Sequence, residues 1–283
     1  MYPILVAAAV LPVVLLCYYI YAKDVNKEPI KLLAKMFFLG CISVVPILFV
    51  ELILENHFST DGVNDFLVVF FYTFIGVAFV EELFKWIIVK FIGHNNKEFD
   101  ELYDIIVYSV FVSLGFACIE NIFYVIQNGL KIALLRALLS VPGHTCFAVI
   151  MGYFFSKAKI NKMNDDYSKC ALNMILSLLM PALIHTMYDA LLFDGVSFSL
   201  FLIFDISMVV YCFVLVQKMS KIQSLVSYSV INGNLVSDVD GHVNFSLENK
   251  SPIRFCPICG KAAKDTDFCN FHYFIMLNRK CIL

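Results

Sequence analysis

Long apolar runs separated by short polar connections dominate this chain. A helix needs about 20 residues to cross roughly 30 Å of hydrocarbon. Apolar runs of about that length recur at approximately residues 2–22, 33–54, 66–91, 103–126, 136–156, 171–193 and 197–217. The remaining polar sequence is too short to cover a soluble core of this size. The pattern therefore predicts an all-α protein, a polytopic transmembrane helical bundle of about seven spans.

Composition supports a membrane protein and argues against one class of partner. Hydrophobic residues make up 60% of the 283 positions and charged residues 16%, whereas soluble domains have about 45–50% and 25%. The mean hydropathy is +0.81. The net charge is −2, and the chain contains no block rich in Lys or Arg. We therefore expect no nucleic-acid partner. The lipid bilayer is the expected environment.

Basic residues mark one side of the predicted bundle. Lysines gather in the first, third and fifth connections, at Lys23, Lys27, Lys31, Lys35, Lys90, Lys97, Lys157, Lys159, Lys162 and Lys169. The second and sixth connections carry no Lys or Arg, and the fourth has only Lys131 and Arg136 at its ends. Short loops rich in Lys and Arg stay in the cytoplasm. We therefore expect the N-terminus outside and the C-terminus in the cytoplasm. The first apolar run has no basic segment before it, which favours a retained span over a cleaved signal peptide.

The composition changes after residue 217 to Ser, Asn, Asp and Gly. This change divides the chain into a transmembrane domain at 1–217, a linker or small β-rich segment at 218–254, and a tail at 255–283. The pairs Asn232-Gly233 and Asp240-Gly241 suit tight hairpin turns between short alternating runs. A flexible linker remains the alternative for this middle segment.

The tail contains a compact pattern of metal-ligand residues. Cys256 and Cys259 are followed by Cys269 and His272, with two residues inside each pair. Three thiolates and one imidazole at this spacing suit a tetrahedral structural zinc ion. We therefore predict a small cytosolic zinc-ribbon-like C-terminal module with a zinc knuckle at 255–283. A site with four protein ligands is closed, so we expect it to bind or regulate and not to catalyse.

The third span carries an unusual group of charges, Glu81, Glu82 and Lys85. Ionisable groups within a span are costly and by default indicate a functional site. Helical spacing puts both glutamates within reach of the lysine, and we expect one to pair with it while the other points elsewhere. The alternative is a group of solvated charges at the membrane interface, with the lysine reaching toward water.

The next three spans supply further polar residues. Glu120 lies in an apolar run with no basic residue on its own helix, so its partner must come from another helix. His144 lies in the fifth span, and His185 and Asp189 lie one helical turn apart in the sixth. Each histidine alone is more often structural. Carboxylates and imidazoles that converge in a bundle core, however, can activate water for hydrolysis.

At these residues the sequence resembles the PrsW-type intramembrane proteases, a group related to CAAX prenyl endopeptidases and abortive-infection membrane proteins. The resemblance covers roughly residues 66–193, with four short motifs in order on successive spans. These motifs are Glu-Glu-x-x-Lys at Glu81, Glu82 and Lys85, Phe-x-x-x-Glu-Asn at Phe116, Glu120 and Asn121, the segment from His144 to Gly152, and His-x-x-x-Asp at His185 and Asp189.

The resemblance implies an endopeptidase that cuts a membrane-protein substrate, in the best-known members an anti-sigma factor, in a bacterial plasma membrane. By the same resemblance, Glu81 and Glu82 supply the general base, and Glu120, His144 and His185 surround the attacked water. The supporting residues are Lys85, Asn121 and Asp189. A His, His, Glu set suits zinc-activated water, and a metal-free glutamate base with histidine at the oxyanion is equally compatible.

Two other classes of function compete with a protease. A proton-coupled transporter could use intramembrane Glu, His and Asp residues as a relay, but the sequence has no internal repeat of the kind many transporters carry. A non-catalytic membrane receptor could signal through the zinc tail. The receptor interpretation expects substitution of Glu81 or His144 to leave function intact.

Overall fold

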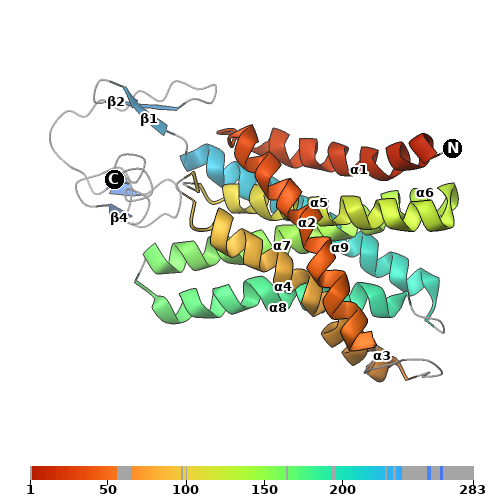
Figure 1. The fold of residues 1–283 in the computed structure, drawn as a ribbon. Coiled ribbons are helices and arrows are strands. Elements are labelled where there is room, and N and C mark those ends of the chain that lie inside the picture. Colours follow the sequence, from red (N-terminus) through yellow and green to blue (C-terminus); the bar gives the residue numbers. More distant parts are fainter. Residues whose placement is uncertain are drawn as a thin grey trace.

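The computed structural model describes residues 2–55, 65–96, 98–99, 101–163, 165–192 and 196–226, and four short strands beyond them. Figure 1 shows the helical part as a bundle of long helices. The helices are α1 (Tyr2–Lys23), α2 (Ile30–Glu55), α3 (Phe66–Thr73), α4 (Phe79–Ile88), α5 (Asp104–Asn128), α6 (Leu130–Leu138), α7 (Ser140–Met163), α8 (Tyr167–Leu191) and α9 (Phe198–Val226), with π-helical turns η1 (Phe74–Ala78) and η2 (Val89–Gly93).

Within these residues, seven helical segments are long and apolar enough to cross a membrane. The prediction of a multi-pass, all-helical domain is therefore confirmed. Outward-facing positions on α2 and α9 are large and apolar, for example Phe49 and Ile203 with 66% and 64% exposure. Such faces suit contact with lipid, where every backbone polar group must be satisfied within a helix.

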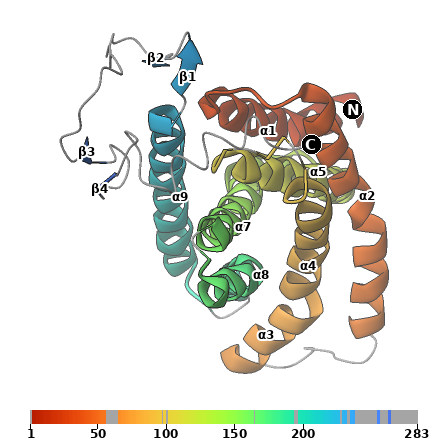
Figure 2. The same cartoon turned by 90° about the vertical axis from the view of Figure 1, so that its left-hand side faces the viewer.

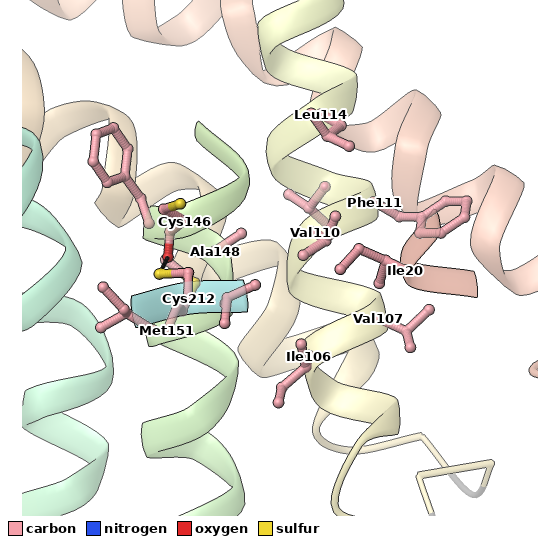
Figure 3. Packing of buried hydrophobic residues seen from close by; sticks show 14 of the residues in the cluster. Ile20, Ile106, Val107, Val110, Phe111, Leu114, Cys146, Ala148, Met151 and Cys212 are labelled. Atoms are coloured by element: carbon pink, nitrogen blue, oxygen red, sulfur yellow. Dashed lines mark hydrogen bonds between the residues drawn. The ribbon is translucent and has the colours of Figure 1, made fainter. Parts of the chain in front are cut away.

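Helix α5 lies at the centre of the bundle, and 83% of its most apolar window is buried. It packs against α1, α2 and α7, and α7 packs in turn against α8 and α9. Figure 2 shows α7 and α8 nearly end-on, between α9 on one side and α4 on the other. Figure 3 shows Val107, Val110 and Phe111 of α5 beside Ile20 of α1. All four of these side chains are buried. The central position of α5 explains why this helix is apolar on nearly all faces.

Two glycines let α2 and α5 approach closely. A Cβ added at Gly40 would lie 2.0 Å from the carbonyl oxygen of Val112, and one added at Gly115 would lie 2.0 Å from the carbonyl oxygen of Phe37. Small residues at such crossings are what allow membrane helices to pack backbone to backbone. The pair fixes the distance between α2 and α5 at the crossing.

The third span is one continuous helical segment, Phe66–Gly93, but it is not a regular α-helix. Two π-helical turns, η1 and η2, flank α4. A π-helical turn inserts an extra residue and rotates the following residues around the helix axis, and it occurs often at functional sites. Here η1 ends at Ala78, three residues before Glu81, so it sets the face on which the charged group lies.

The fifth span differs from the prediction of one helix at 136–156. The chain forms the short helix α6, breaks at Leu139, and continues as α7 from Ser140. Pro142 gives the physical reason, because its ring would clash with the carbonyl of residue 138 and it has no N–H to donate. Arg136 thereby lies on a separate helix from His144.

After α9, β1 (Tyr228–Ile231) pairs antiparallel with β2 (Asn234–Ser237), and β3 (Arg254–Phe255) pairs antiparallel with β4 (Ala262–Ala263). The four predicted zinc ligands lie outside the described residues. The zinc knuckle and the division of the chain at 217 and 254 therefore stay predictions.

Candidate active site

A cavity of about 910 Å³ lies among α2, α4, α5, α6, α7 and α8. Much of its wall is apolar, including Val44 and Leu48 of α2 and Phe147 of α7. Its acidic and imidazole lining residues are Glu51, Glu81, Glu120, His144, His185 and Asp189. All of these except Glu51 were predicted as site residues from the sequence. Predicted site residues from four spans therefore converge on one cavity.

On α4, Lys85 Nζ lies 2.9 Å from Glu81 Oε2 and 2.8 Å from Glu82 Oε1. The expectation that only one glutamate pairs with the lysine is therefore wrong, because Lys85 sits between both. All three residues are buried, which also contradicts a solvated interfacial group. The two glutamates differ in one respect: Glu81 lines the cavity and Glu82 does not.

Glu120 of α5 finds its partners on other helices, as the sequence predicts. Its Oε2 lies 2.7 Å from Arg136 Nη2 of α6 and 3.0 Å from His144 Nε2 of α7. The Arg136 Nε donates to Asn121 Oδ1 at 2.6 Å, and its guanidinium lies 4.1 Å over the Tyr124 ring. Arg136 therefore ties α6 to the polar end of α5.

His144 has a polar neighbour at each ring nitrogen. Besides Nε2 with Glu120, its Nδ1 lies 3.5 Å from Lys85 Nζ. The aromatic ring of Phe116 packs edge-on against the imidazole at 5.6 Å and also contacts the lysine ammonium at 4.1 Å. The carboxylate and the ring packing together fix the orientation of the imidazole.

His185 of α8 is held in a similar way. Its Nδ1 lies 3.3 Å from Glu82 Oε1, and its Nε2 lies 3.4 Å from Asp189 Oδ2. Phe147 stacks on the ring at 4.4 Å between centroids. The imidazoles of His144 and His185 meet edge to face at 5.4 Å. Each histidine therefore has a glutamate from another helix behind it, Glu120 or Glu82.

Three of these residues form a set that could hold a metal ion. One ligand atom from each of Glu81, His144 and His185 lies within 4.8 Å of the other two, and all three residues are buried. Two imidazoles and one carboxylate are the ligand set of many catalytic zinc sites, which keep a fourth position for water. Carboxylates behind the imidazoles are the usual outer partners of such ligands. The residues present therefore fit a zinc-type ion.

Two residues at the cavity were not among the sequence-derived site residues. Glu51 near the end of α2 and Arg136 of α6 both line it. The rule that singled out Glu120 also applies to Glu51, because it is a carboxylate within an apolar span. The sequence places Arg136 at an end of the fourth connection, whereas in the structure it belongs to α6 and lines the cavity.

Comparison with known proteins gives one consistent result. The family model described as PrsW family intramembrane metalloprotease matches residues 28–217. A protein named Protease PrsW from Oceanobacillus iheyensis is 40% identical over 198 residues, covering 70% of this chain and 87% of that protein. The Bacillus subtilis protein of the same name is 38% identical over 189 residues, covering 66% and 82%. That of Clostridioides difficile is 30% identical over 235 residues, covering 80% and 94%.

No solved structure gave a significant match to this chain.

Proposed function

From the membership of this chain in the PrsW family, which makes it a membrane-embedded protease, we propose that it hydrolyses a peptide bond of a membrane-protein substrate in the cavity beside Glu81. One observation carries this proposal: Glu81, His144 and His185 converge within 4.8 Å on the cavity wall. Family membership favours the protease over the transporter and receptor interpretations. As substrate class we propose membrane-spanning proteins such as anti-sigma factors.

Two routes of water activation fit the residues at the cavity. In the first, Glu81, His144 and His185 would hold a divalent metal ion such as zinc, which when bound would lower the pKa of water and polarise a carbonyl. In the second, Glu81 itself accepts the proton of the attacking water, and the nearby imidazoles stabilise the oxyanion. In both routes Glu81 acts from the cavity wall, because Glu81 lines the cavity and Glu82 does not.

The other polar residues act by holding these groups in place. Glu82 accepts from Lys85 and neighbours His185 Nδ1 at 3.3 Å, so we assign it to the orientation of that imidazole. Glu120 does the same for His144 at 3.0 Å. Lys85 pairs with both α4 glutamates. Buried charges are stable only when paired and hydrogen-bonded in this way.

We also propose the side of the membrane on which the cavity lies. Three residues that line the cavity lie at helix ends: Glu51 is one turn from the end of α2, Leu192 follows α8, and Phe198 begins α9. These ends adjoin the second and sixth connections, which carry no Lys or Arg. By the distribution of basic loops, the cavity belongs to the outer half of the membrane.

The test uses the purified full chain in liposomes with a model single-span substrate. We expect wild type to cleave it and Glu81→Gln to be slower by about 10²- to 10⁴-fold, the range for loss of a general acid or base. Glu55→Gln, an exposed glutamate one turn beyond Glu51 on α2, is the matched control and should retain activity. Cleavage by Glu81→Gln at the wild-type rate would contradict the proposal.

Chelation separates the two routes. If a metal ion is held at the cavity, a strong chelator abolishes cleavage and added zinc restores it. If Glu81 is the general base without a metal, cleavage continues in chelator and still depends on Glu81. The assay is best done in a Cys256→Ser/Cys259→Ser background. Chelator and added zinc then do not act through the predicted zinc site of the tail.

A further inference from the structure

Glu51 differs from the other acidic residues at the cavity in its partners. Glu81 pairs with Lys85, Glu120 with Arg136, and Asp189 with His185, all within 3.4 Å. Glu51 has no hydrogen-bond or ion-pair partner among the residues that the structure describes, and its Oε1 is buried. A buried carboxylate without a partner is costly. Among the described residues, Glu51 is therefore the acidic residue of the cavity wall that has no polar partner.

The surroundings of Glu51 suit a long side chain with a charged end. Val44 and Leu48 lie on the same helix, two turns and one turn before Glu51, and line the same cavity. Together they form an apolar strip that ends in a carboxylate. The aliphatic stem of lysine or arginine packs on such a strip while its charged head reaches a polar group.

We infer that Glu51 determines substrate specificity by accepting a basic side chain, lysine or arginine, of the membrane-protein substrate near the bond that is cut. This inference rests on the proposed function, because the cavity must receive the substrate. A charge-assisted hydrogen bond to a carboxylate is stronger than one between neutral groups. Substrates without a basic side chain at this position leave Glu51 without a partner and are disfavoured, so the contact is selective.

The experiment compares peptides that differ in one charge. A series of single-span peptides carries one lysine at successive positions within about five residues of the cleaved bond, and each has a matched peptide with norleucine, which has a similar stem and no charge. For wild type we expect one position at which lysine raises kcat/KM about 10- to 100-fold over norleucine, the value of a hydrogen bond to a charged group. Glu51→Gln should reduce this ratio to about one.

Two further variants make the result specific. Glu55→Gln, on the same helix and outside the cavity lining, should keep the wild-type ratio. Glu51→Lys should reverse it and favour a peptide with glutamate at the sensitive position. The inference is overturned if no position shows a lysine preference in wild type, if the preference survives in Glu51→Gln, or if that variant slows lysine and norleucine peptides equally.

A binding readout separates this inference from the proposed function. The same peptides are photo-crosslinked to the Glu81→Gln variant, which holds them without cutting. A lysine preference in binding that is lost when Glu51→Gln is added to this variant supports the Glu51 contact. This holds even if wild type cleaves none of the peptides, because the absence of cleavage would contradict only the protease proposal. Cleavage without any lysine preference in rate or binding would contradict the Glu51 contact alone.

Discussion

Replacing Gly115 by alanine should push α2 and α5 apart. The new Cβ would lie 2.0 Å from the carbonyl oxygen of Phe37, 2.9 Å from its carbonyl carbon and 3.2 Å from the backbone nitrogen of Cys41. All three neighbours are backbone atoms, so no side-chain rotation relieves the contact. Ordinary van der Waals contact begins at about 3.4 Å, and the helices must therefore separate locally by more than 1 Å.

We expect a loss of stability and of activity together. Overpacking of a closely packed core typically costs about 1–3 kcal/mol. For a domain of this size, each 1 kcal/mol lowers Tm by about 2–4 °C, so Gly115→Ala should unfold roughly 2–12 °C below wild type. Activity should fall as well, because α2 and α5 both line the cavity, α2 with Glu51 and α5 with Glu120.

The assay is thermal unfolding in detergent, followed by cleavage of the model substrate at a temperature where both proteins are folded. Gly40→Ala, with its Cβ 2.0 Å from the Val112 carbonyl oxygen, should behave alike. Gly76→Ala is the control, because its Cβ would meet only the Tyr72 ring at 3.9 Å. A Gly115→Ala protein as stable and active as Gly76→Ala would refute the close-approach argument.

Four further results are expected. Lys85→Met leaves two buried carboxylates without their cation, so unfolding measurements should show a loss of about 3–5 kcal/mol. Arg136→Gln frees the carboxylate that orients His144, and kcat/KM should drop about 10- to 100-fold, as for other outer-shell partners. His94 lies outside the spans, and burial, followed by the positive charge of Lys90, lowers its pKa to about 4. Because the unfolded value is about 6.5, the unfolded chain binds more protons between pH 6.5 and 4, so Tm should fall as pH drops through this window and His94→Gln should flatten the fall. Cys256→Ser should remove about one equivalent of zinc from the purified protein if the tail holds the predicted knuckle.

Sequence patterns alone predicted a polytopic membrane protein and most of the acidic and imidazole residues that line the candidate site. Seven apolar runs can only be satisfied as membrane helices, since a helix pairs its own backbone groups where no water is present. The cost of charge in hydrocarbon then singled out Glu81, Glu120, His144 and His185 before any contact was known. For Glu120, the lack of a basic residue on its own helix already required a partner from elsewhere, and Arg136 and His144 supply it.

The positions of these groups relative to the cavity follow from contacts between helices and not from the local sequence. Adjacent Glu81 and Glu82 are equivalent in the sequence, but the helix rotation after η1 and the packing against α8 bring Glu81 to the cavity and Glu82 behind His185. In the sequence, Glu51 is a single carboxylate within an apolar run. The structure shows that it lines the same cavity as Glu81, Glu120 and His185. Such contacts link residues far apart in the chain and depend on helix crossings, which local patterns of hydrophobicity do not encode.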